Sequence, residues 1–342
     1  MILKNVVGIR RGTVVAATAL TLALAACSGG TAESPDTAAP GSQSAAGKTL
    51  VIGFAQQSLT APYFVAMQKE AERMAKQEGF KLVFQAANMD PVTQINQAET
   101  MVAQGIDALL VNTVNVETEE PKMREMAKKL PLVFIDTAVP DVGVSAVQSD
   151  NVAIGHGAGL IMAKRFKQGE TIKVGILNGG ARDVFTGPNR RKGFLSGLED
   201  GGIKYEIVIE ADANYAQEAA VTAAESMLAA HPDLDVIYGY NDSMALGALQ
   251  TLRTLGNTTT LVAGIDGQKE ALKEILDGGC KGQYVSTGLN SPTLATRKGL
   301  EIVLSILRGK STAADFPKLI TTKAAGIGCE NIKDYYDPNS VF

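Results

Sequence analysis

The stretch that decides the fold reads D-V-I-Y-G-Y-N-D-S-M-A-L-G-A-L at 235–249, followed by L-V-A-G-I-D at 261–266. Val236–Tyr240 and Leu261–Ile265 are short uncharged runs rich in β-branched and aromatic residues, which is typical of buried parallel strands. Apolar residues recur at helical spacing between the two runs. We therefore predict a strand, a helix and a second strand running parallel to the first.

A polar side chain follows each of these two strands, Asn241 after the first and Asp266 after the second. In open α/β sheets, ligands bind outside the carboxyl ends of the strands. An amide and a carboxylate together offer hydrogen-bond donors and acceptors, which suits a polar ligand rich in hydroxyl groups. The alternative is that each residue only caps the helix that follows it.

The same alternation of strands and helices continues along the chain in two successive series without a long linker. It predicts an α/β fold of two similar doubly wound parallel-sheet lobes that are joined by a hinge and close around a ligand. We assign residues 49–149 plus 291–320 to the N-terminal lobe and 150–290 plus 321–342 to the C-terminal lobe. The other predicted strands are Thr49–Phe54, Lys81–Ala86, Ala108–Asn112, Leu132–Ile135, Val144–Gln148, Ile172–Leu177, Lys204–Ile209 and Lys281–Thr287.

The first 48 residues do not read as part of these lobes. Basic residues near the start precede an uncharged run, Gly12–Ala26, which is typical of a secretory signal and short for a membrane span. L-A-A-C at 24–27 resembles the lipobox of bacterial lipoproteins. By that resemblance residues 1–26 are a signal peptide and Cys27 carries a lipid. Residues 27–48 are rich in Ser, Gly, Thr, Ala and Pro and are expected to form a flexible tether.

The charge of the chain argues against nucleic acid as a partner. The full sequence has 32 basic and 36 acidic residues, a net charge of −4. Removing residues 1–26 removes three basic residues and no acidic one, so 29 basic residues face 36 acidic residues and the balance becomes −7. A mildly acidic surface does not attract a polyanion.

Two cysteines remain after Cys27, and they are Cys280 and Cys329. In an oxidising compartment they could form a disulfide or stay free, because separation in sequence does not give distance in space. Neither belongs to a Cys-x-x-Cys pair, so we expect no metal or redox cofactor there.

The sequence contains no obvious catalytic set. His156 and His231 are the only histidines, and a serine-hydrolase G-x-S-x-G elbow is absent. Gly309-Lys310-Ser311 resembles the end of a phosphate-binding loop, but Leu304 stands where the first glycine is required. We therefore predict that the chain is not an enzyme and needs no cofactor.

Several motifs taken together resemble the periplasmic sugar-binding proteins of the ribose/galactose type, the extracellular receptors of ABC importers. They are P-Y-F at 62–64, Q-G-I-D-A-L-L at 104–110, F-I-D at 134–136, S-D-N at 149–151, N-D-S-M-A-L-G-A-L at 241–249 and G-I-D-G at 264–267. Related sugar-responsive repressors share this core but begin with a DNA-binding helix-turn-helix. A signal and tether occupy that place here.

The resemblance implies roles for seven residues. Tyr63 and Phe64 fall where the family places aromatic rings against the sugar, and Tyr215 falls where a ring from the other lobe stacks on the opposite face. Asp136, Asn241, Asp266 and Asn290 fall at hydroxyl-binding positions. The alternative for Tyr63 and Phe64 is that they only pack beneath the first helix.

Three family contacts for ribose are replaced. The resemblance places an arginine at Thr137, a second arginine at Pro188 and an asparagine at Ala61. Arg182, Gln56 and Gln57 are candidates to supply some of the lost contacts. The ligand is thus a sugar, a polyol or another small hydroxylated molecule.

We predict an extracytoplasmic, membrane-anchored, monomeric solute-binding lipoprotein that delivers its ligand to the permease of an ABC importer. One alternative is a receptor whose closed form binds a signalling protein. Another is an enzyme that uses Asp136 and Asp266 as an acid and base pair.

Overall fold

The structure is a computed structural model that describes residues 48–181 and 183–342. The predicted signal peptide, all but Lys48 of the predicted tether, the lipidation site Cys27 and the candidate ligand residue Arg182 lie outside the described residues. Within the described ranges, no helix has both the length and the apolar character that crossing a membrane requires.

Two six-stranded sheets form the framework of residues 48–342. Their strand orders are β11-β5-β4-β3-β1-β2 and β12-β10-β9-β8-β6-β7, and all neighbours are parallel except β12, which runs antiparallel to β10. We call the first sheet with its helices the first lobe, and the second sheet with its helices the second lobe. The predicted fold of two parallel-sheet lobes is confirmed. The strands are β1 (Val51–Gln56), β2 (Lys81–Ala86), β3 (Ala108–Val111), β4 (Leu132–Ile135), β5 (Ser145–Gln148), β6 (Thr171–Asn178), β7 (Lys204–Asp212), β8 (Val236–Gly239), β9 (Leu261–Asp266), β10 (Tyr284–Leu289), β11 (Leu319–Thr321) and β12 (Gly326–Gly328).

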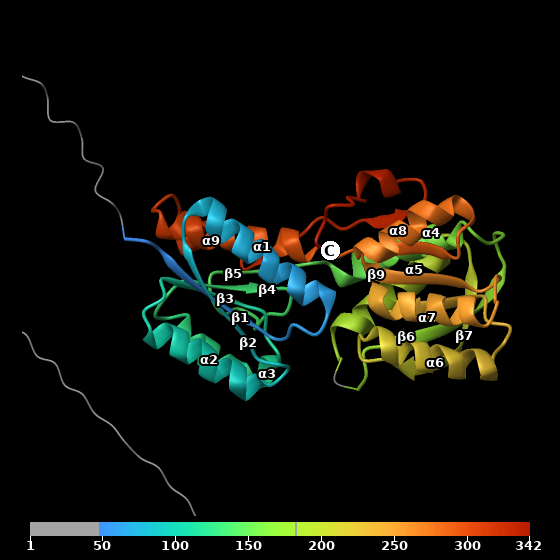
Figure 1. Cartoon of the computed structure of the whole chain (residues 1–342), viewed down its shortest axis with the longest axis horizontal. Helices are drawn as coiled ribbons and strands as arrows, with labels where there is room; N and C mark the ends of the chain where they lie inside the picture. The colour runs from blue at the N-terminus through green and yellow to red at the C-terminus, as the bar shows by residue number, and fades with distance from the viewer. Residues whose placement is uncertain (1–47, 182) are drawn as a thin grey trace, which may run out of the picture. The chain divides into compact units, whose positions relative to one another are not determined.

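Helices cover both faces of each sheet. In the first lobe α1 packs with α9, and α2 packs with α3 on the opposite face (Figure 1). In the second lobe α4 packs with α5, while α6 packs with α7 and α7 contacts α8. The helices are α1 (Pro62–Glu78), α2 (Pro91–Ala103), α3 (Val116–Met126), α4 (Asn151–Ala163), α5 (Thr186–Asp200), α6 (Gln217–Ala230), α7 (Asp242–Thr254), α8 (Lys269–Gly278) and α9 (Pro292–Leu307).

Local sequence explains where these helices begin. Pro62, Pro91 and Pro292 open α1, α2 and α9, because proline has a helical φ and no amide hydrogen to leave unpaired. The carboxylate of Asp90 accepts hydrogen bonds from the first free amides of α2, and Ser291 caps α9 in the same way. Since these helices follow the carboxyl ends of strands, their first turns lie at the ligand-binding edge of each sheet.

Helices α4 and α5 pack with their backbones in close contact. A Cβ on Gly155 would lie 2.3 Å from the carbonyl oxygen of Arg190, and a Cβ on Gly193 would lie 2.1 Å from that of Val152. Any larger residue would push the helices apart. This close approach fixes the position of Arg190, which is important in the site described below.

The last segment of the chain runs against both lobes. Cys280 and Cys329 form a disulfide, so the open question about these cysteines is answered for the structure. Ile332 is buried in the core of the second lobe. Phe342, however, packs against the core of the first lobe. Of the segment 321–342 that the sequence assigned to the C-terminal lobe, Thr321 lies in β11 of the first sheet and Phe342 contacts the first lobe.

Candidate functional site

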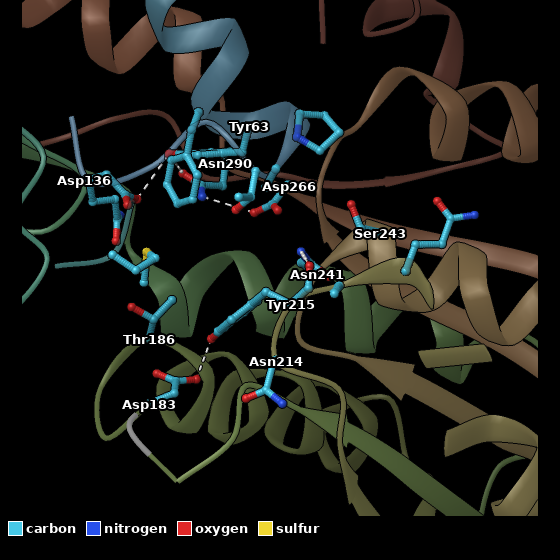
Figure 2. Close-up of a pocket in the computed structure, with 18 of the residues that line it drawn as sticks. Tyr63, Asp136, Asp183, Thr186, Asn214, Tyr215, Asn241, Ser243, Asp266 and Asn290 are labelled. Atoms are coloured by element: carbon cyan, nitrogen blue, oxygen red, sulfur yellow. Dashed lines mark hydrogen bonds between the residues drawn. The ribbon is translucent and has the colours of Figure 1, made fainter. Parts of the chain in front are cut away.

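A cavity of about 580 Å³ is lined by residues from both lobes. Ligand pockets for small molecules commonly have volumes of this order. Seven of the predicted site residues line it, and they are Tyr63, Phe64, Asp136, Tyr215, Asn241, Asp266 and Asn290. Figure 2 shows Tyr63, Asp136, Asp266 and Asn290 close together, with Tyr215 approaching from the other side of the cavity.

Tyr63 lies in the first turn of α1 and forms part of the first-lobe wall. Its hydroxyl is placed to donate a hydrogen bond to Asp136 Oδ1 at 3.1 Å or to Asn290 Oδ1 at 3.2 Å. Burial, together with the negative charge of Asp136, raises the pKa of Tyr63 well above its ordinary value, so the hydroxyl keeps its proton. The ring of Tyr63 also belongs to the first-lobe core. The alternatives of packing and lining the cavity are therefore both true of Tyr63.

Asp136 follows β4 directly and has a φ of 66°, a conformation that is uncommon for a residue with a side chain. Asn112 donates to its Oδ2 at 3.4 Å, and Tyr63 approaches its Oδ1. Burial raises the pKa of Asp136, although the more distant positive charge of Arg190 opposes the rise. Within the described residues, no salt bridge to Asp136 is formed.

Asp266 ends β9 and has a direct cationic partner. Arg190 Nη2 lies 3.0 Å from Asp266 Oδ1, and Asn290 Nδ2 donates to the same oxygen at 3.1 Å. Leu289 is the register partner of Asp266 in β10, so the next residue, Asn290, comes out beside the carboxylate. Burial raises the pKa of Asp266 to about 7, while the attraction of Arg190 acts in the opposite direction.

The cap interpretation is wrong for Asp266 and right for Asn241. Helix α8 has Gln268 at its N-cap, and no side chain caps it. Asn241 is the N-cap of α7, where its Oδ1 accepts from the Met244 amide at 2.9 Å. The same side chain lines the cavity, and its Nδ2 donates to the carbonyl oxygen of Tyr215 at 3.2 Å.

Arg190 is the most important site residue that the sequence analysis missed. It is only 4% exposed and lies within α5. Its Nε donates to Asn151 Oδ1 at 3.0 Å, and its Nη1 donates to the carbonyl oxygen of Tyr240 at 2.7 Å. Arg190 begins the motif R-R-K-G-F at 190–194. An arginine in a predicted helix carries no sequence signal that its side chain points towards the carboxyl end of a strand.

Tyr215 lies in the loop before α6, two residues ahead of Gln217, where the helix begins. Its backbone has a φ of 61°, which is not helical. The Tyr215 hydroxyl donates a hydrogen bond to Asp183 Oδ2 (Figure 2). This bond, together with the one from Asn241 to the Tyr215 carbonyl, holds the ring at the cavity wall.

The candidate Gln56 does not line the cavity, whereas its neighbour Gln57 does. Gln56 is fully buried, and its Nε2 lies 3.4 Å from Met67 Sδ beneath α1. Gln57 Nε2 donates to Asn112 Oδ1 at 2.8 Å. Successive residues of an extended segment point in opposite directions, so only one of the two glutamines can face the ligand side.

Other polar residues also line the cavity and were not predicted. Most of them lie in loops or at helix starts that follow strand ends, which is the one signal in the sequence that could have found them. Of the three positions where family contacts are replaced, Ala61 lines the cavity, while Thr137 and Pro188 do not. The unpredicted polar residues, besides Arg190, are Thr60, Asp183, Thr186, Asn214, Gln217, Glu218 and Ser243.

The described residues hold no group of three or more His, Cys, Asp or Glu side chains arranged to bind a metal ion. The described side chains that line the cavity are carboxylates, amides, hydroxyls and aromatic rings, together with Arg190, whose charge is balanced by Asp266.

The periplasmic binding protein domain matches residues 52–311, which is most of the chain. The chain belongs to this family. It is 32% identical over 293 residues to the ribose import binding protein of Bacillus subtilis, covering 85% of this chain and 92% of that protein. It is 30% identical over 314 residues to the xylitol-binding protein of Mycolicibacterium smegmatis, covering 89% and 82%.

Solved structures of the periplasmic binding protein family agree with the two-lobe fold. An ABC transporter solute-binding protein from Mycobacterium smegmatis with bound glycerol has a TM-score of 0.75 and 29% identity, covering 85% of this chain and 98% of that one. The Caulobacter myo-inositol binding protein has a TM-score of 0.72 and 26% identity, covering 84% and 95%. Family membership makes the chain a binding protein rather than an enzyme, as the sequence analysis predicted.

Proposed function

We propose that this protein is the extracytoplasmic solute-binding component of an ABC importer and that it binds a sugar or polyol in the cavity between its lobes. The observation that carries the proposal is the convergence of Asp136, Asn241, Asp266 and Asn290 on a cavity that is also lined by aromatic rings. Relatives named for ribose and xylitol binding support the same ligand class.

The chemistry of the cavity favours an uncharged, hydroxyl-rich ligand. Carboxylate and amide oxygens accept hydrogen bonds from hydroxyl groups, and the amide nitrogens donate to hydroxyl oxygens. The rings of Tyr63, Phe64 and Tyr215 offer flat apolar surface for the C–H faces of such a ligand. Among the described residues that line the cavity, Arg190 carries the positive charge, and that charge is already paired with Asp266.

A thermal-shift screen tests the ligand class. D-ribose, D-allose, xylitol, glycerol and myo-inositol are the probes, with a sugar phosphate as the charged control. A ligand that binds only the folded state stabilises it by about 2.7 kcal/mol at one hundred times its Kd, so a bound probe raises the melting temperature by several degrees. If none of the neutral probes shifts the melting temperature while the phosphate does, the proposed ligand class is wrong.

We further propose that the lobes close by rotating about the three crossings of the chain between them, near Ser149, Asn290 and Thr322. Ser149 Oγ donates to Asn290 Oδ1 at 2.7 Å and lies 2.9 Å from Thr322 Oγ1, so one hydrogen-bonded group joins all three crossings. Lobe closure around a ligand gives a smaller radius of gyration in small-angle scattering. An unchanged radius with a saturating ligand would contradict this hinge.

The L-A-A-C sequence at 24–27 supports a further proposal, that a lipid on Cys27 anchors the protein to the outer surface of the cell membrane beside its permease. We expect the Cys27→Ala variant to leave the membrane fraction. Retention of the variant in that fraction would contradict the anchor. Cross-linking in cells should capture a permease subunit, whereas capture of a signalling receptor alone would contradict the transport role.

A further inference from the structure

The segment after β12 is fixed to the second lobe over most of its length. Cys329 is joined to Cys280 by the disulfide, and Ile332 is 3% exposed in the second-lobe core. Tyr335 and Tyr336 pack against the same core. Further along, Lys269 Nζ, at the start of α8, donates to the carbonyl oxygen of Ser340 at 2.7 Å. The chain is thus held to the second lobe as far as Ser340.

Two residues later the same segment contacts the first lobe. The ring of Phe342 meets the ring of Tyr63 edge to face, with centroids 5.7 Å apart and planes at 86°. Phe342 also packs against the rest of the first-lobe core. Aromatic pairs at this distance and angle are in a favourable geometry. Residues 337–342 therefore join the lobes in addition to the three crossings near Ser149, Asn290 and Thr322.

The ring that Phe342 contacts belongs to the ligand site. Tyr63 lines the cavity, and its hydroxyl approaches Asp136 and Asn290. Phe64 packs edge to face on Tyr63 as well, with centroids 5.7 Å apart. Phe342 is not among the cavity-lining residues, so it supports the Tyr63 ring from outside the cavity. The two phenylalanines together restrict the orientation of that ring.

We propose that residues 337–342 form a strap between the lobes, and that Phe342 is a positioning residue that holds Tyr63 in its ligand-binding orientation. Lys269 supplies the second-lobe attachment of the strap, and Tyr63 supplies the first-lobe attachment. The strap couples the ligand site to the relative position of the lobes, because displacing Phe342 both loosens Tyr63 and detaches the segment. The effect of the strap on ligand affinity rests on the proposed function, whereas the contacts of the strap with the two lobes do not.

The affinity test uses a double-mutant cycle on the full chain, with D-ribose and xylitol as the probes. Phe342→Ala should weaken binding by about three- to tenfold, which corresponds to the worth of one aromatic pair. Phe342→Tyr, which keeps the ring, should restore affinity to near the wild-type value. In a Tyr63→Ala background, Phe342→Ala should have no further effect, because its contact is already gone.

Leu255→Ala at the end of α7 is the control outside the strap, since Leu255 is 58% exposed and should leave affinity unchanged. A Phe342→Ala variant with a lower melting temperature and wild-type affinity would make Phe342 a purely structural residue and overturn the positioning role. Equal losses from Phe342→Ala in the wild-type and Tyr63→Ala backgrounds would overturn it as well.

A ligand-free measurement tests the strap even if neither probe binds. Hydrogen exchange followed by mass spectrometry should show faster exchange at residues 338–342 in Lys269→Ala, and at the first turn of α1 in Phe342→Ala. Lys273→Ala is the control in the same helix, since its Nζ bonds Asp277 instead. Unchanged exchange in both test variants would overturn the strap. Failure of both probes to bind the wild type would count against the proposed function, and the exchange result would still decide the strap.

Discussion

The two lobes place a carboxylate at corresponding strand ends but stabilise it differently. Asp136 follows β4, Asp266 ends β9, and both have positive φ angles, 66° and 125°. Asp266 is paired with Arg190 at 3.0 Å, whereas Asp136 is contacted by neutral groups such as the hydroxyl of Tyr63. Removing one partner of a buried ion pair costs much stability, because the other charge is left buried and unpaired. A carboxylate that is contacted only by neutral groups can be neutralised at less cost. Under the proposed function, we therefore expect Asp266 to support both fold and ligand binding, and Asp136 to contribute to ligand binding with little effect on stability.

The largest expected effect comes from removing Arg190. Arg190→Ala leaves the Asp266 carboxylate buried without its partner, which typically costs about 3–5 kcal/mol of the free energy of unfolding. Chemical denaturation at pH 8, where Asp266 is ionised, measures this loss. Arg191→Ala is the matched control, because Arg191 forms a more exposed pair with Glu210 and should change stability by less than about 1 kcal/mol. Equal losses of unfolding free energy in Arg190→Ala and Arg191→Ala would contradict the claim that the pair with Arg190 makes Asp266 more important for stability than Asp136.

The pH dependence of affinity gives the next largest effect. The pKa of Asp266 is about 7, which is above its value in the unfolded chain. Between about pH 4 and 7 the carboxyl group of Asp266 is therefore mostly protonated in the ligand-free fold but ionised in the unfolded chain. The contribution of Asp266 to the free energy of unfolding therefore falls as the pH rises through that range. The affinity for ligand should instead increase as the pH rises, because ligand hydroxyls donate hydrogen bonds to the ionised carboxylate. We expect up to about tenfold weaker binding per pH unit below 7.

Calorimetric titration at pH 5, 6, 7 and 8 measures this profile, and Asp266→Asn is the control that should lose the component with a midpoint near 7. Arg190 would keep its charge but lose its counter-charge, and it would donate to a neutral amide oxygen instead, so the variant must first be shown to fold. A wild-type affinity that is constant from pH 5 to 8 would contradict an ionised Asp266 as the ligand contact.

The smallest effect is expected for the stability of Asp136→Asn. The amide is the same size as the carboxylate, and its oxygen still accepts the hydrogen bond from Tyr63, while the cost of burying a charge disappears. We expect a change in the free energy of unfolding of less than about 1 kcal/mol, measured by denaturation without ligand. A loss as large as that of Arg190→Ala would show that Asp136 is structural too.

Local patterns in the sequence predicted the framework, and they also pointed to strand-end residues that line the cavity. Strand and helix periodicity predicted two parallel-sheet lobes, and a polar residue after a buried strand pointed to Asn241 and Asp266, while the family resemblance pointed to Asp136. Arg190 could not be predicted in this way, since its direction depends on the close packing of α4 and α5 at Gly155 and Gly193. Side-chain direction also separates Gln57, which lines the cavity, from Gln56.

The final segment shows a second limit of local patterns. A short stretch such as Asp337–Phe342 has no periodicity, so nothing in its composition assigns it to one lobe or the other. Only the three-dimensional structure places Phe342 against Tyr63, while Lys269 holds the preceding residues on the other lobe. The disulfide was undetermined for the same reason, because the distance between Cys280 and Cys329 depends on tertiary structure.

Isothermal titration of D-ribose and xylitol into the wild type and Asp136→Asn at pH 8 tests the central claim most directly, because this variant is expected to fold normally. A charge-assisted hydrogen bond is worth about 1.5–3 kcal/mol, so the account predicts one-to-one binding by the wild type and an affinity at least tenfold lower in the variant. Equal affinity in the two proteins, or no binding of either probe to the wild type, would contradict the claim that these strand-end carboxylates bind a polyhydroxylated ligand.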